Sequence, residues 1–244
     1  MGSIEWSRLG IEAVTIVGAI LLAFAIEAWW DDWQQDRDEQ IVLESLLGSV
    51  VEKKSTLQEY RVYIENILGA VVRLKEATDP DRRFSGSDEA DVVMDKMLWS
   101  SLLGVSEAPA LSALFSGGGV SEIDNQMLLQ ELVELRSSLI ALNNVVEGDV
   151  KFFHQDLMPF MHQRANLTQI QNVSAGMPHP SNVHTGTIIL HAGEKQDHLQ
   201  LIDDKVFQNL QLSRIWHLQN TQAVLDTIEP QLQKSIDSLR AELN

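Results

Sequence analysis

The most continuous apolar stretch of the chain lies near its amino end, over residues 9–30. It reads LGIEAVTIVGAILLAFAIEAWW and carries no charge between Glu12 and Glu27. A helix of this length rises about 33 Å, enough to cross the roughly 30 Å hydrocarbon core of a bilayer. The pattern therefore predicts a transmembrane helix over residues 9–30, with residues 1–8 as a short tail before it.

Tryptophans flank this stretch on both sides, as is typical where a membrane helix passes through the two interfaces. We expect interfacial anchors at Trp6, Trp29, Trp30 and Trp33. A cleaved signal peptide is the alternative, because Ala23-Phe24-Ala25 has the small-x-small form of a cleavage site. The membrane helix is favoured, since the apolar run is long and a basic cluster does not precede it.

Beyond residue 40, apolar residues recur every three or four positions, which is the spacing of amphipathic helices. Lys53 interrupts the first of these stripes and Asp149 the second. Stripes of this kind need one another to be buried, so we expect a helical bundle. The three long stripes occupy residues 43–74, 128–160 and 210–243.

Chain-breaking residues mark where the helices should end. No Pro or Gly occurs in residues 19–47, so the first stripe should continue the membrane helix as one rod that stops at Asp79-Pro80. Ser121 or Asp124 is expected to cap the second long helix, and Pro230 to kink or divide the third. Shorter helices are expected near 88–103 and 108–116, the latter ended by Gly117-Gly118-Gly119.

Residues 166–197 differ in kind, because Gly and Pro residues surround the β-branched Thr187-Ile188-Ile189. We expect an irregular excursion here, with a short strand or hairpin. The predicted fold is otherwise all-α: an amino-terminal transmembrane helix that continues into a helical domain over residues 31–244.

The chain carries a formal net charge of −17 and no cysteine. Before residue 31 only Arg8, Glu5, Glu12 and Glu27 are charged, so nearly all of this negative charge belongs to residues 31–244. Such a domain repels nucleic acid, and the lack of cysteine excludes disulfides and thiolate sites. Because basic residues are retained in the cytoplasm, Arg8 predicts a cytoplasmic tail and a periplasmic domain on a bacterial inner membrane.

The sequence gives little indication of a catalytic or metal-binding site. Three of the seven histidines fall in the irregular segment and His198 directly follows it; His184 and His191 could meet across a hairpin, but no His-Glu-x-x-His spacing occurs. Surface histidines are therefore the better interpretation. Asp31-Asp32 and Asp203-Asp204 are better explained as solvated residues or helix starts than as catalytic pairs. We predict no catalytic, cofactor or metal site, and no enzyme activity.

Within the apolar stretch, Glu12 lies about one turn inside the membrane. It either reaches the headgroups or pairs with a neighbouring membrane helix. Gly18, Ala19 and Ala23 give the helix a low-profile face on which another helix can pack closely. The predicted membrane-helix interface is therefore Glu12, Gly18, Ala19 and Ala23.

The run Glu12-Ala13-Val14-Thr15-Ile16-Val17-Gly18, then Ile20-Leu21-Leu22-Ala23 and Trp29-Trp30, resembles the amino-terminal signature of a group of uncharacterised bacterial single-span membrane proteins. A second patch, Ala110 to Arg136, is similar to that group's next block, with Ser116-Gly117 as its turn and Leu135-Arg136 in its Leu-rich helix. The resemblance implies an anchored helical fold, and it points to no particular activity.

These observations predict an accessory or scaffold subunit, without catalysis or cofactor, that docks on a larger membrane complex such as a respiratory or photosynthetic one. Its partners would be the membrane and other membrane protein subunits. Association with further copies of the same chain is a possibility that the sequence leaves open. The alternative is an extracytoplasmic ligand-sensing or binding module. Because residues 1–8 are too few for an output domain, a sensor would have to signal through a partner.

Overall fold

The computed structural model describes residues 5–98, 108–117, 119–173, 193 and 195–243, with side chains from Ile16 onward except that of Asp32. Every element in these ranges is helical, so the predicted all-α class is confirmed. The elements are α1 (Glu5–Glu76), η1 (Pro80–Arg82), α2 (Ser87–Met97), α3 (Pro109–Ser116), η2 (Gly119–Glu122), α4 (Gln126–Phe152), η3 (Phe153–Leu157), α5 (Met158–Arg164), α6 (Leu167–Val173), α7 (Leu199–Ile202) and α8 (Lys205–Glu242).

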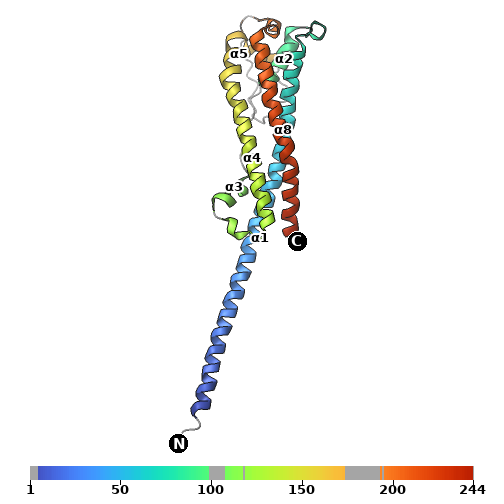
Figure 1. Cartoon of the computed structure of the whole chain (residues 1–244). Helices are drawn as coiled ribbons and strands as arrows, with labels where there is room; N and C mark the ends of the chain where they lie inside the picture. The colour runs from blue at the N-terminus through green and yellow to red at the C-terminus, as the bar shows by residue number, and fades with distance from the viewer. Residues whose placement is uncertain (1–4, 99–107, 118, 174–192, 194, 244) are drawn as a thin grey trace.

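Helix α1 is one uninterrupted rod of 72 residues. At 1.5 Å per residue it is about 108 Å long, and its amino-terminal part projects from the bundle (Figure 1). The helix ends shortly before Asp79, whose carboxylate accepts a hydrogen bond from the Asp81 backbone N–H (3.1 Å) and caps the short turn that begins at Pro80. The predicted single rod and its end are confirmed.

The bundle is built from α1, α4 and α8, with α8 packed against both of the others and antiparallel to them (Figure 1). The predicted stripes face its core. The central apolar side chains of all three helices are at most 1% exposed: Leu46, Val50, Ile64 and Ile67 of α1, Leu132, Leu135 and Leu139 of α4, and Leu218, Leu225 and Leu232 of α8.

Polar contacts along α8 fix its register against both neighbours. Arg61 of α1 pairs with Asp226 and Glu229 of α8, each at 2.7 Å. Glu131 of α4 accepts a hydrogen bond from Ser238 (2.8 Å) on the other side of α8. A shift of α8 by one turn would break the contacts on both sides.

The shorter helices pack on this frame. Helix α2 lies against α1 and α6, and α3 lies against α1. The predicted glycine turn after α3 begins at Gly117, whose N–H donates to the Ala113 carbonyl at 2.7 Å. A Cβ atom at Gly117 would lie 2.9 Å from that carbonyl oxygen, so only glycine fits without a shift.

Two predicted helix boundaries are wrong. Asn125, and neither Ser121 nor Asp124, caps α4: its Oδ1 accepts hydrogen bonds from the backbone N–H groups of Met127 (3.0 Å) and Leu128 (3.1 Å). Pro230 does not divide α8, which continues through it. Buried Ile228 and Leu232 on either side hold the helix together against the loss of one backbone hydrogen bond.

The predicted irregular segment of residues 166–197 is partly helical. Helix α6, Leu167–Val173, occupies its first part, where Asn166 Oδ1 accepts a hydrogen bond from the Gln169 backbone N–H (3.1 Å). The predicted strand or hairpin around Thr187 lies outside the described residues.

The helix cap at the start of α8 can be tested by comparing two adjacent residues, Asp203 and Asp204. Asp204 Oδ1 caps the helix by accepting from Val206 N (2.7 Å) and Phe207 N (3.2 Å), whereas Asp203 pairs with Arg83 on the surface. Asp204→Ala should lower the free energy of unfolding by about 1 kcal/mol, because two helix N–H groups lose their acceptor. Asp203→Ala, the control, should cost less than about 0.5 kcal/mol in urea unfolding, since exposed ion pairs contribute little. Equal losses would contradict the assigned cap.

Candidate functional site

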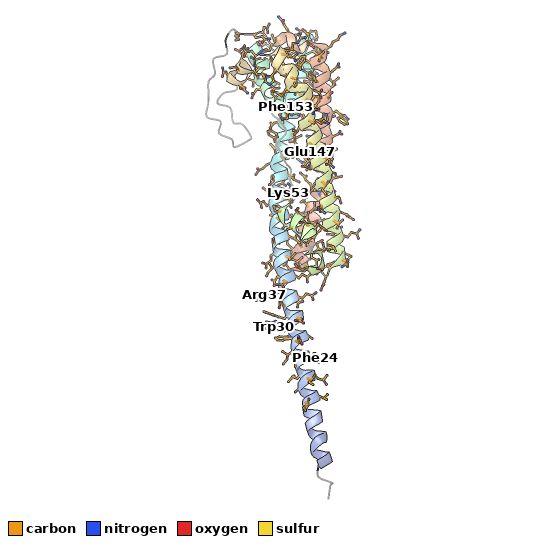
Figure 2. The ribbon with its side chains drawn as sticks, turned by 90° about the vertical axis from the view of Figure 1, so that its left-hand side faces the viewer. Phe24, Trp30, Arg37, Lys53, Glu147 and Phe153 are labelled. Carbon is orange, nitrogen blue, oxygen red and sulfur yellow. The ribbon has the colours of Figure 1, made fainter. Side chains whose placement is uncertain are left out.

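The lower part of α1 stands clear of the bundle. Every described side chain from residue 16 to 38 is exposed. At the base of the bundle the Glu39 carboxylate accepts a hydrogen bond from the Asp124 N–H (3.0 Å), and the first buried side chain is Leu43. Figure 2 places Phe24 and Trp30 on this bare stretch of helix.

The bare stretch is apolar. Its large side chains are 49–65% exposed over residues 16–30, a list that includes Ile16, Val17, Ile20, Leu21, Leu22, Phe24, Ile26, Trp29 and Trp30. Full burial of one such side chain is worth about 1.5–3 kcal/mol. Soluble monomers rarely expose a continuous apolar surface of this extent. We therefore expect another molecule or a lipid phase to bury these side chains.

The residues of the predicted helix interface lie on this surface. An added Cβ atom at Gly18 would meet nothing within 4 Å, and Ala19 and Ala23 are exposed. None of these three contacts another described element of the chain. The side chains of Glu12 and Trp6 lie outside the described ones, although Glu12 and Trp6 both belong to α1.

The tryptophans at the upper end of the stretch form an aromatic ladder. The rings of Trp30 and Trp33 have centroids 5.3 Å apart and planes inclined by 41°. The Arg37 guanidinium carbon lies 5.6 Å from the Trp33 ring centroid, which is within the range of a cation–π contact. Trp29 is 65% exposed and is rotated by about 100° from Trp30 around the helix axis.

Within the part of the chain whose side chains are described, no helix has a stretch long and apolar enough to cross a membrane. The predicted transmembrane helix of residues 9–30 is therefore unsupported by the described residues. The side chains of residues 9–15, its first portion, lie outside them.

Acidic residues gather where α1 enters the bundle. Asp31, Asp38 and Glu122 line one shallow depression, and Asp36, Glu39 and Glu242 line a second. Four of these carboxylates belong to α1, one to η2 and one to α8, and both depressions are open to solvent. Among the described residues no three His, Cys, Asp or Glu side chains are arranged to hold a metal ion.

A buried ion pair joins α4 to α8 inside the bundle. Asp149 of α4 accepts a hydrogen bond from Arg214 of α8 at 2.5 Å, and both side chains are 0% exposed. The Arg214 guanidinium also lies 5.3 Å from the Phe153 ring centroid. Asp149 was expected only as an interruption of its stripe, and Arg214 was not anticipated.

Burial dominates the electrostatics around this pair. It raises the pKa of the Asp149 carboxyl, because the charged form loses its hydration, while Arg214 acts in the opposite direction. Burial also raises the pKa of Tyr63 on α1 to about 12. The pKa of His217, which stacks on Phe152 with centroids 5.1 Å apart, is lowered mainly by burial.

A second buried network closes the far end of the bundle. His198 Nε2 accepts a hydrogen bond from the Asn166 backbone N–H (3.0 Å), so its Nδ1–H is the donor to Asp91 Oδ1 (2.6 Å). The other Asp91 oxygen accepts from Gln169 Nε2 (2.7 Å). The backbone N–H of His198 donates to Ser87 Oγ (3.1 Å). These bonds join the chain at residue 198 to α2 and α6.

The histidine expectation is therefore wrong at one position. His154 and His162 are exposed, but His198 is fully buried and His217 is half-buried. His179, His184 and His191 lie outside the described residues. For the paired carboxylates, the helix-start interpretation is confirmed at Asp204.

Comparison of the chain with models of protein families, with characterised proteins and with solved structures gives no match.

The buried pair makes a specific prediction about stability. Arg214→Met should lower the free energy of unfolding by about 3–5 kcal/mol, because it leaves the Asp149 carboxylate buried without its counter-ion. Combining it with Asp149→Leu should recover most of this loss, since an apolar replacement removes both desolvation costs.

Urea unfolding of the single and double variants measures this coupling. Arg83→Met, which breaks an exposed pair with Asp203, is the control and should change stability by less than about 1 kcal/mol. Strictly additive losses for Asp149→Leu and Arg214→Met would contradict an energetically coupled pair.

Proposed function

We propose that this protein is a non-catalytic, membrane-anchored accessory or scaffold subunit that docks on a larger membrane protein complex. The observation that carries the proposal is the bare apolar stretch of α1. It is one helix with the core of the bundle, yet its own side chains pack on nothing in the described chain. A rigid bundle is thereby held on a stem that needs an apolar surrounding.

A bilayer is the surrounding that fits this stem best. The apolar sequence continues below Ile16 to Leu9, with Glu12 as its one charged residue. The resulting length matches the roughly 30 Å hydrocarbon core, and tryptophans stand at both ends of it. A cluster of acidic residues begins at Asp31, directly after Trp29 and Trp30. We place the bundle in the periplasm of a bacterium, because Arg8 lies on the other side of the stretch.

The polar residues of the bundle support a non-catalytic role. The Asp149–Arg214 and Asp91–His198 pairs are each 0% exposed, so neither can reach a substrate without opening the bundle. Their geometry instead joins helices to one another. The exposed carboxylates at the lower end of the bundle lie on open surfaces, which lack the enclosed environment that shifts catalytic pKa values apart.

Docking is proposed to use the anchor itself. Glu12, Gly18, Ala19 and Ala23 give one helix a carboxyl group and small residues, and these let a partner helix approach closely enough for hydrogen bonding and dispersion. A carboxyl group about one turn inside the apolar region costs a few kcal/mol unless it reaches water or is paired. A partner helix that pairs with Glu12 would remove this cost.

The proposal is tested by co-purification from native membranes in mild detergent, followed by mass spectrometry of the proteins that migrate together. Gly18→Leu or Glu12→Ala should release the protein from its complex, because each removes a feature that the partner helix contacts. Both variants should stay in the membrane pellet after alkaline extraction.

Ala28→Leu is the matched control, since it makes a similar small-to-large change outside the predicted interface and should leave the complex intact. Replacing residues 9–30 with an unrelated leucine helix should also release the protein. Unchanged co-purification after that replacement would show that the bundle alone docks. Loss of the wild-type protein into the alkaline supernatant would contradict the membrane anchor.

A further inference from the structure

We propose that Trp30, Trp33 and Arg37 form a binding site for the phosphate of a phospholipid headgroup, in the leaflet on the side of the bundle. This inference rests on the proposed membrane anchoring and adds a specific lipid contact to it. The three residues stand at i, i+3 and i+7, so they share one face of α1. Figure 2 labels Trp30 and Arg37 on the exposed stem below the bundle.

The indole rings of Trp30 and Trp33 hold the Arg37 guanidinium in position. Trp30 and Trp33 lie 5.3 Å apart by ring centroid, and the Arg37 guanidinium lies 5.6 Å from the Trp33 centroid. A guanidinium that stacks on an indole keeps its N–H edge available for hydrogen bonds in the ring plane. That edge suits two oxygens of one phosphate group, which it can bind in a bidentate manner.

Arg37 differs from most arginines of the bundle in having no carboxylate partner among the described side chains. The positions three and four residues away are Trp33, Gln34, Gln40 and Ile41, and none is acidic. Five other arginines do pair with carboxylates: Arg61, Arg73, Arg82, Arg83 and Arg214. The positive charge of Arg37 therefore remains available to an anion from outside the chain.

The neighbouring acids are turned away from this face. Glu39 is engaged with the Asp124 N–H at the base of the bundle. Asp36 lines a depression with Glu242, and Asp38 lines another with Glu122. Residues adjacent in a helix are rotated by about 100°, so Asp36 and Asp38 point to either side of the ladder. An anionic headgroup can thus approach the stem on the ladder side without meeting these carboxylates.

The expected depth of the Arg37 guanidinium in the membrane also matches that of the lipid phosphates. If the hydrocarbon core ends near Trp30, Trp33 lies about 4.5 Å above it and the Arg37 backbone about 10 Å above it. Helical side chains point toward the amino end, so the guanidinium is carried back to the level of Trp33. The headgroup layer on each side of the core is about 5–8 Å thick, and phosphate groups lie within it.

The test is a solid-state NMR dipolar measurement between arginine guanidinium carbons and lipid phosphorus. The full chain, labelled with ¹³C at arginine Cζ and carrying Arg8→Lys so that no arginine remains at the opposite membrane interface, is reconstituted in vesicles of phosphatidylethanolamine and phosphatidylglycerol. We expect phosphorus-dependent dephasing of one arginine signal, its loss in Arg37→Gln, and its partial loss in Trp33→Ala, which removes the stacking surface. Arg136→Gln is the matched control, because Arg136 also stacks on a ring, that of Phe115 at 5.1 Å, but lies in the bundle. It should leave the dephasing unchanged.

Dephasing that persists in Arg37→Gln would overturn the site. Absence of dephasing in wild-type protein that resists alkaline extraction would overturn it too, while leaving the anchor intact. Protein that is extracted by alkali would instead remove the proposed function on which the site rests. In a maltoside detergent with inorganic phosphate the contact should be absent, and dephasing there would identify a general anion site and overturn the assignment to a lipid.

Discussion

The continuity of α1 is the constraint on which the rest of the structure depends. One helix supplies both the bare apolar stem and a third of the bundle core, and its backbone hydrogen bonds run without interruption from Glu5 to Glu76. Helical periodicity then fixes which residues face inward above Leu43 and which face outward below it. Because a helix resists bending, the bundle is held at a set distance and rotation relative to the stem. Any partner of the stem consequently meets the bundle in one orientation.

Inside the bundle, apolar burial and buried polar groups have different roles. The leucine and isoleucine side chains of the three stripes supply most of the stabilisation, since each is worth about 1.5–3 kcal/mol when fully buried. The Asp149–Arg214 pair contributes little net stability, because desolvation offsets its Coulomb attraction. Its effect is on register: the apolar stripes alone would tolerate a shift of α8 along α4, whereas a shifted helix would leave two buried charges apart. The Asp91–His198–Gln169 network restricts the opposite end of the bundle in the same way.

Much of the fold could be predicted from the sequence, because the spacing of apolar residues indicates which side chains are buried. The rod over α1 and the three stripes could be predicted, since a spacing of three and four residues has one structural meaning over many turns. The ends of the helices were harder to predict than the helices themselves. Ser121, Asp124 and Asn125 are all good caps within a few residues. In the structure the Asp124 N–H donates to Glu39 and the Asn125 amide donates to Glu242, and these contacts between distant parts of the chain accompany the cap at Asn125. Pro230 was expected to kink or divide α8; the helix is not divided, because packing on both sides of Pro230 outweighs the local penalty.

The buried polar residues were missed for a related reason. Arg214 occupies the gap between Leu210 and Leu218 in the third stripe, and Asp149 interrupts the second. Opposite charges in two facing stripes were the available signal, but it has meaning only once the two helices are known to be neighbours. The ladder of Trp30, Trp33 and Arg37 lies within one helix, so its geometry follows from spacing alone. The proposed contact between a partner helix and Glu12, Gly18, Ala19 and Ala23 depends on a second molecule, which no single sequence contains.

A spin-label scan of α1 tests the central claim most directly. The chain has no cysteine, so a cysteine introduced at each position from 10 to 45 gives one label at a time in the full chain reconstituted in vesicles. The account predicts high oxygen and low nickel-chelate accessibility below Trp30, the reverse from Trp33 to Asp38, and above Leu43 a 3.6-residue oscillation with minima at the buried positions. Nickel-chelate access along the whole stem would contradict the membrane anchor. A segment of highly mobile labels between Trp30 and Leu43 would contradict the single rigid rod.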